Sequence, residues 1–421
     1  MLAGVFKKGR AKSYSYSFMG NLLSSVSQWV VLMLIAKLYG TTQMGHYSLA
    51  LAWILPLYAF FSLQIRNIHV ADQTDTYGFN LFFQIRVVCA AVFFLTTLLI
   101  GYLFYRDIVL VFIMGGLFKS FEMVSDVIHA EFHKRKRIAV YSKMLMFRSM
   151  LAILLNLGMF RFIASFELAL ISLPLAYFCS MLIDFRLLKG LQIPVKLDIA
   201  NPLVKKIIGT GVLTGLSLLL VYMLPNIPRF ILEKFRSSFE LGLFSGYISL
   251  VIFTRIFVQS VVQNSLPYLA QHYDDNNLAK FLSKLKKEAG LITVLGLLQF
   301  LLVPVSGYIF PLLFNKDFAG NQTLLCLIFT GSLFSFLAFV LNNGINAMKM
   351  FSIQLPVYAC MVALSIGMAW FLIPKYGLNG AAMSVVVVNV TLCATLFSII
   401  ITKLNQKERM INQLSKQVEI W

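Results

Sequence analysis

The sequence has few charged residues for its length. Lys, Arg, Asp and Glu together make up 13% of its 421 residues, and 59% of the residues are hydrophobic. Soluble domains carry about a quarter charged residues, so this scarcity predicts an integral membrane protein. Acidic residues are the rarer sign, 17 against 36 basic ones, which leaves a net charge of +19. The basic residues lie in short segments between apolar runs, so membrane orientation explains them better than nucleic-acid binding does.

Cysteine pairs and nucleotide-binding or metal-binding motifs are also missing from the sequence. The five cysteines fall singly inside apolar runs, which predicts core residues rather than disulfides or metal ligands. No phosphate-binding Walker loop is present, so we do not expect direct drive by ATP. His129 and His133 have the spacing of a zinc-binding helix, but Glu131 stands at the wrong position and four cations follow. We therefore predict no catalytic residues, no metal and no cofactor, and a protein that is not an enzyme.

What the sequence has in abundance is long apolar runs. A membrane-spanning helix needs about 20 mostly apolar residues, and twelve runs meet this condition. They cover approximately residues 15–38, 44–64, 80–104, 107–130, 139–160, 166–188, 207–225, 240–265, 289–314, 320–346, 354–373 and 378–402. The first run is longer than a signal-peptide core and is followed by no cleavage site, so we expect it to be retained. The predicted fold class is an all-α polytopic membrane protein with twelve transmembrane helices.

Basic residues are distributed unevenly among the segments that connect these runs. The rich set comprises the amino-terminal residues 7–12, residues 133–137, Lys189, Lys196, Lys205, Lys206, residues 280–287, Lys403, Lys407, Arg409 and Lys416. The alternate segments hold only scattered charges. The positive-inside rule then places the rich set and both termini in the cytoplasm. The lysines of residues 274–287 also predict an amphipathic surface helix that favours anionic headgroups.

One stretch of the chain occurs twice. Residues 34–52 and residues 231–249 align with a shift of 197 positions, which pairs Gly45 with Gly242 and Thr41 with Ser238. Each copy ends one apolar run, turns through polar residues and begins the next run. The repeat predicts two related halves. We place an amino-terminal lobe of six helices at residues 1–188, a cytoplasmic linker at 189–206, a carboxyl-terminal lobe at 207–402 and a cytoplasmic tail at 403–421.

Charged residues inside the predicted spans are costly and therefore indicate function or pairing. They are Arg86, Lys119, Glu122, Asp126, Lys143, Arg148 and Arg255, which sum to a net charge of +3. Lys119 and Glu122 can pair within one helix. Arg148 and Arg255 have no carboxylate three or four positions away, and a cluster of unpaired cations suits a phosphate or pyrophosphate. We predict that these two arginines face each other across a cavity, with Arg86 nearer its cytoplasmic mouth. The alternative is that each arginine is a structural pin bonded to helix-end carbonyls.

The first span and the seventh span also carry polar or small residues at helical spacing. In the first these are Ser17, Asn21, Ser24 and Gln28, and in the seventh Gly209, Thr210, Gly211, Thr214, Gly215 and Ser217. Such stripes favour close helix packing or line a water-filled cavity, and the sequence leaves both readings open.

Three stretches together resemble the bacterial polysaccharide transporter family. They are residues 37–45, the segment QIRN at 64–67 followed by Asp72, Tyr77 and Arg86, and the turn LIPKYGLNGAA at 372–382. The family comprises O-antigen and capsule flippases, in the superfamily of lipid II flippases and multidrug-and-toxin extruders. The resemblance implies two six-helix lobes around a central cavity that opens alternately to either face. It also implies an undecaprenyl-pyrophosphate-linked oligosaccharide as substrate, moved to the outer leaflet of the bacterial inner membrane.

The resemblance further implies drive by an ion gradient or by the membrane potential. Glu122 and Asp126 are the candidates for an ion-coupling group, and Arg148, Arg255, Arg86 and Lys119 for a cationic substrate site. Arg255 matches a cationic position in lipid II flippases, but the first two spans offer only Lys37, so their arginine triad is not expected here. Expected partners are membrane lipids and the polymerase and chain-length regulator of the same pathway.

Two other functions stay open at this point. A drug or metabolite antiporter of the same fold should favour a carboxylate in its cavity, and the net charge of +3 argues against it. A surface-polysaccharide polymerase usually carries a large outer loop, whereas the longest outer loop here, residues 226–239, is short.

Overall fold

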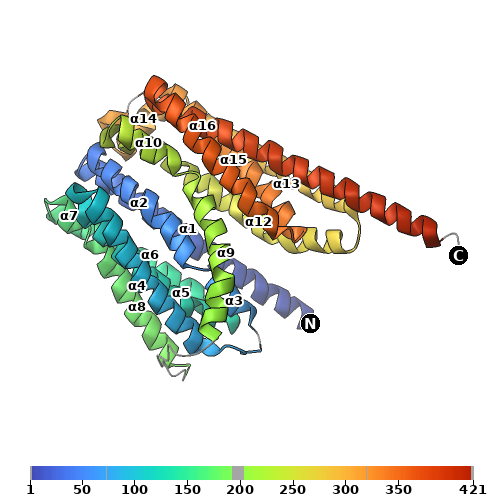
Figure 1. Cartoon of the computed structure of the whole chain (residues 1–421). Coiled ribbons are helices and arrows are strands. Elements are labelled where there is room, and N and C mark those ends of the chain that lie inside the picture. Colours follow the sequence, from blue (N-terminus) through green and yellow to red (C-terminus); the bar gives the residue numbers. More distant parts are fainter. Residues whose placement is uncertain (1, 73, 192–202, 319, 419–421) are drawn as a thin grey trace. The chain divides into compact units, whose positions relative to one another are not determined.

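The computed structural model describes residues 2–72, 74–191, 203–318 and 320–418, and within these ranges all regular secondary structure is helical (Figure 1). The prediction of an all-α protein is therefore confirmed. The helices are α1 (Leu2–Leu38), α2 (Thr41–Phe61), α3 (Ile65–Ala71), α4 (Gly78–Phe104), η1 (Arg106–Ile108), α5 (Val109–Lys134), α6 (Ile138–Phe162), α7 (Phe166–Ala169), α8 (Ser172–Lys189), α9 (Leu203–Met223), α10 (Ile227–Phe235), α11 (Ser238–Ser249), α12 (Val251–Asp274), α13 (Leu278–Leu298), η2 (Gln299–Leu302), α14 (Ser306–Leu313), η3 (Lys316–Phe318), α15 (Gln322–Ala347) and α16 (Phe351–Val418).

Eight helices among the described residues are long and apolar enough to cross a membrane, or eleven if each bent pair of helices forms one span. The longest, α16, consists of two helices that meet at Gly377, whose φ of 54° and ψ of −128° are not helical. This break lies where the sequence predicts the turn between the last two spans. Gly380 lies against the carbonyl oxygen of Leu372, and a Cβ there would overlap it. The count of twelve spans stays a prediction.

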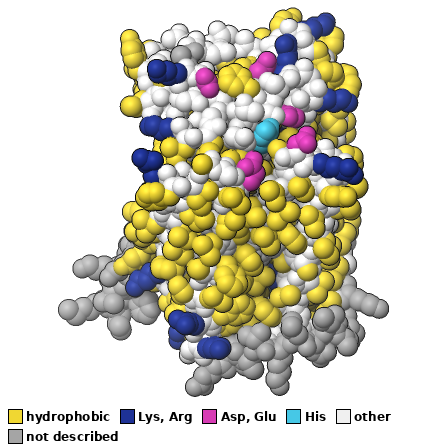
Figure 2. Space-filling model, turned by 90° about the vertical axis from the view of Figure 1, so that its left-hand side faces the viewer, with side chains coloured by type: hydrophobic (Ala, Val, Ile, Leu, Met, Phe, Trp, Pro, Cys, Tyr) yellow, Lys and Arg dark blue, Asp and Glu magenta, His cyan; other side chains and the backbone are white. Residues whose placement is uncertain are grey.

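The surface of the protein is apolar over large areas. Figure 2 shows one face on which hydrophobic side chains gather into a continuous area. Exposed apolar residues such as Leu95, Leu99 and Leu154 lie on α4 and α6. Exposed apolar patches of this kind would be unfavourable in water, and they suit contact with lipid chains. The protein is thus a multi-pass membrane protein.

Two connecting segments differ from their predicted structure. The lysine-rich residues 278–287 do not form a separate surface helix, because α13 begins at Leu278 and continues to Leu298. The side chain of Asn277 caps this helix by accepting a hydrogen bond from the backbone N–H of Lys280 at 3.2 Å. The predicted outer loop at 226–239 contains α10. Helix α14 also differs from a straight span, since it bends by 83° from the helix of residues 278–302.

The chain forms two compact units. The first comprises Met1–Glu233, Ser237–Gly246 and Leu313–Asp317, and the second comprises Lys234–Arg236, Tyr247–Leu312 and Phe318–Trp421. In the first unit α1 packs on α6, α5 packs on α4 and α8, and α2 packs on α9. In the second unit α15 packs on α12, α13 and α16. The predicted lobes at 1–188 and 207–402 stay a prediction, and residues 192–202 of the predicted linker lie outside the described residues.

The small residues of α9 pack against α2 within the first unit. A Cβ at Gly211 would lie 2.9 Å from Cβ of Leu63, and a Cβ at Gly215 would lie 2.7 Å from the carbonyl oxygen of Phe60. Close helix packing therefore accounts for these two glycines. The side chain of Thr210 lies outside the described residues.

The repeated stretch forms a symmetric crossing of α2 and α11, also within the first unit. Gly45 lies against the carbonyl oxygen of Ser238, and Gly242 lies against the carbonyl oxygen of Thr41. A Cβ at either glycine would overlap that oxygen. Because the shift of 197 positions relates Gly45 to Gly242 and Thr41 to Ser238, the two contacts are equivalent. The repeated glycine is thus explained by the close approach of two backbones.

Candidate functional site

The charged side chains of the first unit are organised around one face of α5. Lys119, Glu122 and Asp126 follow one another at spacings of three and four, which places them on the same side of a helix. Helices α3, α4 and α6 bring further cations to this face. We call the resulting group of Arg66, Arg86, Lys119, Glu122, Asp126 and Arg148 the cationic cluster.

Glu122 binds two of these cations. Its carboxylate accepts a hydrogen bond from Nζ of Lys119 at 2.6 Å and one from Nη2 of Arg148, on α6, at 3.1 Å. Aromatic rings complete the surroundings, since Nζ of Lys119 lies 5.3 Å from the ring centre of Tyr58 and the guanidinium of Arg148 lies 4.9 Å from that of Tyr177. The rings stabilise the two cations without adding negative charge.

Asp126 binds the other two cations. Nη2 of Arg86, on α4, donates to one carboxylate oxygen at 2.8 Å, and Nη1 of Arg66, on α3, donates to the other. The guanidinium of Arg66 also lies 4.9 Å from the ring centre of Tyr141. Asp126 thus ties the short helix α3 to α4 and α5.

The cationic cluster has more positive charge than negative, with four cations for two carboxylates. Arg86 is 1% exposed, yet its Nε and Nη1 have no hydrogen-bond partner among the described residues. The same is true of Nε of Arg148. Buried N–H groups without a partner are costly, and charged donors in surplus can bind an anion. The side chains of Arg66, Glu122 and Asp126 are 28%, 14% and 17% exposed, so the cluster is only partly buried.

The structure confirms the predicted pair of Lys119 and Glu122. The prediction that Arg148 is unpaired was wrong, because its carboxylate partner, Glu122, lies on a different helix, α5. Arg86 likewise meets Asp126. Arg66 was not predicted as a site residue, and its only sequence signal is the segment QIRN at 64–67.

Two cations of the predicted spans are not part of the cationic cluster. Arg255 is exposed on α12 of the second unit, and no ion pair joins it to another described residue. Lys143 is exposed on α6. That Arg148 and Arg255 face each other across a cavity stays a prediction.

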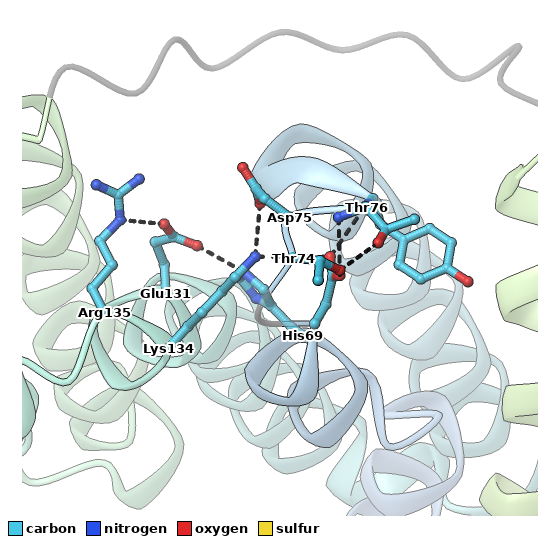
Figure 3. A network of polar contacts seen from close by, with 9 residues as sticks. His69, Thr74, Asp75, Thr76, Glu131, Lys134 and Arg135 are labelled. Atoms are coloured by element: carbon cyan, nitrogen blue, oxygen red, sulfur yellow. Dashed lines mark hydrogen bonds and ion pairs between the residues drawn. The ribbon is translucent and has the colours of Figure 1, made fainter.

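A second polar network joins the segment between α3 and α4 to the basic end of α5 (Figure 3). His69, which is fully buried, meets a carboxylate oxygen of Glu131 at 2.8 Å, and the other oxygen of Glu131 accepts from Nε of Arg135 at 2.5 Å. Lys134 donates to Asp75 at 2.7 Å and lies 3.8 Å from Asp72. This loop therefore neutralises Lys134 of the predicted cytoplasmic basic segment, and Glu131 of α5 neutralises Arg135.

Asp72 holds the loop in shape. Its carboxylate accepts hydrogen bonds from the backbone N–H groups of Thr76 at 2.9 Å and Tyr77 at 3.0 Å. Burial alone would raise the pKa of Asp72, but these N–H groups and the charge of Lys134 outweigh it and lower that pKa. The ionised carboxylate is thus the form that the loop stabilises.

The two histidines with the spacing of a zinc site have separate partners. His129 meets a carboxylate oxygen of Asp184, on α8, at 3.1 Å, and both side chains are buried. The ring of His133 stacks on that of Tyr141 at 6.2 Å between ring centres. The pair of His129 and Asp184 therefore links α5 to α8.

Comparison with known proteins gives relatives along almost the whole chain. No family model matches the sequence. The capsular polysaccharide biosynthesis protein CapF of Staphylococcus aureus is 24% identical over 379 residues, covering 89% of this chain and 95% of CapF. The solved structure of the lipid II flippase MurJ in an inward closed conformation matches with a TM-score of 0.73 at 13% identity, covering 94% of this chain and 90% of MurJ.

A MOP superfamily transporter from Pyrococcus furiosus matches with a TM-score of 0.66 at 12% identity, covering 94% and 96% of the two chains. The chain has the fold of the MOP-superfamily transporters. The resemblance to polysaccharide flippases of this superfamily, predicted from the sequence, is confirmed. Any function assigned to this protein must therefore account for the cationic cluster within a transporter fold.

Proposed function

We propose that the protein is a flippase for an undecaprenyl-pyrophosphate-linked oligosaccharide, the repeat unit of an O-antigen or a capsule. The observation that carries this proposal is the surplus positive charge of the cationic cluster, together with the unpartnered N–H groups of Arg86 and Arg148. The relative CapF, whose name assigns it to capsular polysaccharide biosynthesis, supports this choice of substrate.

The charge of the cluster matches the chemistry of a pyrophosphate group. Such a group carries multiple negative charges and enters a hydrocarbon region only with counter-charge. At an effective dielectric constant of about 20, a cation about 4 Å from a phosphate oxygen contributes roughly 4 kcal/mol before desolvation. Arg86, Arg148 and Lys119 would supply this counter-charge in the first unit, and Arg255 is the candidate in the second.

We place the protein in the bacterial cytoplasmic membrane with both termini in the cytoplasm. The asymmetry of the basic segments supports this orientation. The substrate would then bind from the cytoplasmic leaflet and leave to the outer one by alternating access. A polymerase and a chain-length regulator would act on the product. Drive by an ion gradient or by the membrane potential fits the fold.

A deletion of the gene in its host tests the proposal. Surface polysaccharide should disappear while lipid-linked repeat units accumulate facing the cytoplasm, which can be measured by their protection from an added glycan-modifying enzyme in sealed, right-side-out vesicles. Repeat units that reach the outer leaflet singly and fail only to polymerise would identify a polymerase instead. Normal surface polysaccharide with altered resistance to organic cations would favour a drug antiporter, although the surplus of cations in the cluster argues against cationic cargo.

A further inference from the structure

The second unit contains a buried carboxyl group that the cationic cluster does not involve. Glu288 lies on α13 and is 4% exposed. Neither of its carboxylate oxygens has a hydrogen-bond partner among the described residues. An ionised carboxylate in such a place would lose its hydration without replacement, which costs several kcal/mol.

Among the described residues, Lys284 is the one charged group that pairs with this carboxyl. Nζ of Lys284, one turn earlier on α13, lies 3.7 Å from Oε1, too far for a hydrogen bond. The Lys284 side chain is 42% exposed, so water screens its charge. Lys284 also lies 5.9 Å from the ring centre of Tyr268, on α12. This lysine is therefore a weak counter-ion for a carboxylate that is itself out of water.

The helices packed on α13 bring polar but uncharged groups to Glu288. Ser265 of α12 is a hydroxyl beside Glu288, and it donates to the carbonyl oxygen of Val262 at 2.9 Å. Asn343 of α15 donates from Nδ2 to Oγ of Ser265 at 3.1 Å and to the same carbonyl at 3.0 Å. Neither α15 nor η2 contains a Lys, Arg, Asp or Glu, and the titratable residues Arg255, His272 and Asp274 of α12 form no ion pair with Glu288 among the described residues. The hydroxyl of Ser265 and the amide of Asn343 thus already have acceptors other than Glu288.

Glu288 differs in this from Glu122 and Asp126, the acidic residues expected from the sequence to couple an ion. Each of those carboxylates is bound by two cations, which favour its ionised form. A group that takes up and releases a proton during transport has to change its surroundings between a dry, unpaired state and a wet one. Among these three carboxyl groups, the dry and unpaired state is that of Glu288.

We propose that Glu288 is a proton-binding site, with a proton on its carboxyl group in this conformation, and that its proton release and uptake couple a proton gradient to transport. The coupling part rests on the proposed function, whereas the bound proton does not. The proton neutralises the carboxyl where no donor is free. When α12, α13 and α15 open to water, the carboxyl ionises and releases that proton, and it rebinds a proton when the helices close.

Infrared spectroscopy of the purified protein in lipid tests the bound proton without any substrate. The difference spectrum between wild type and Glu288→Gln at neutral pH should contain the carbonyl band of a protonated carboxylic acid. Glu408→Gln, at an exposed carboxyl on α16, is the matched control and should remove a carboxylate band instead. A carboxylate band in the Glu288→Gln difference would show that Glu288 is ionised and would overturn the proposal.

Proteoliposomes test the coupling. A proton gradient should accelerate the translocation of a polyprenyl-pyrophosphate-linked oligosaccharide by wild type, and Glu288→Gln should translocate it at equal rates with and without the gradient. An unchanged response of Glu288→Gln, or acceleration by a sodium gradient alone, would reject proton coupling at Glu288 and leave the flippase function standing. Conversely, an acid band in the wild type without any translocation would reject the flippase function and retain the proton site.

Discussion

At the scale of single residues, the charged side chains of the first unit differ in how completely they are neutralised. Glu122 and Asp126 are each bound by two cations, whereas the buried guanidinium of Arg86 has two nitrogen atoms without a hydrogen-bond partner among the described residues. Carboxylates that are fully engaged suit a structural part of the site. Donors left over in a buried place suit the recognition of an anion.

Replacing Arg148 with alanine should reduce export of the polysaccharide per unit of folded protein. A hydrogen bond to a charged group contributes about 1.5–3 kcal/mol, so the loss should be roughly tenfold or more. Glu122 keeps Lys119 as a partner in this variant, which limits the loss of stability. Arg148→Lys should retain part of the activity, because an ammonium attracts phosphate but lacks the two-pronged geometry of guanidinium. Export and the amount of folded protein are measured on the same cells.

The matched control is Arg161→Ala, at an exposed position of the same helix, which should leave export unchanged. If Arg148 were only a structural pin, export by Arg148→Ala would fall in proportion to the amount of folded protein. A constant ratio of export to folded protein would therefore contradict the binding role.

The charged residues on one face of α5 could be predicted from the sequence, but their ion-pair partners on other helices could not. Spacing along one helix predicts the pair of Lys119 and Glu122, since both lie on the same turn. The pairs of Arg86 with Asp126 and of Arg148 with Glu122 join positions 40 and 26 apart in the chain. Such pairs depend on how helices pack, and no local pattern encodes that.

At the scale of elements, the crossing of α2 and α11 allows a sharp test. Gly242→Ala would place a Cβ where the carbonyl oxygen of Thr41 lies, and backbone cannot move away as a flexible side chain can. Overpacking of this kind costs about 1–3 kcal/mol. The variant should therefore unfold at a lower temperature in detergent. Gly158→Ala, in α6 with open space around the new Cβ, should instead be neutral or stabilising, by up to about 1 kcal/mol.

The symmetry of this crossing gives a second readout. Gly45→Ala should destabilise by a similar amount, and the double variant should cost less than the sum of the two, because one displacement of α2 from α11 relieves both overlaps. Strictly additive losses would mean that the two glycines act independently and that the crossing is not one joint contact.

The positions of most helices followed from apolar runs, because lipid requires long apolar helices whatever their packing. The sequence did not reveal that residues 278–287 belong to α13. Their lysines resemble a surface helix, yet no proline separates them from the apolar residues that follow, and the helix continues through Gly290. The bend before α14 was not predicted, because the residues on both sides of Pro304 are apolar and together have the length of one span. A proline inside such a run can break the helix.

At the scale of the whole molecule, the distribution of basic residues predicts the topology in the membrane. Lys and Arg are retained on the cytoplasmic side during insertion, so segments rich in them mark that side. Reporter enzymes that are active only outside the cytoplasm should give signal when fused at Arg106, Asn226, Lys316 or Lys375, and no signal at Lys136, Lys196 or Lys284.

Lys136 is the most stringent of the inside positions. Lys134 and Arg135 beside it are neutralised by Asp75 and Glu131, so the remaining positive charge of this segment must be enough to keep it in the cytoplasm. Lys196, in the predicted linker, decides between an even and an odd number of spans before the second lobe. Signal at Lys196 with silence at Lys136 would mean five spans rather than six before the linker, and the proposed two lobes of six helices would have to be abandoned.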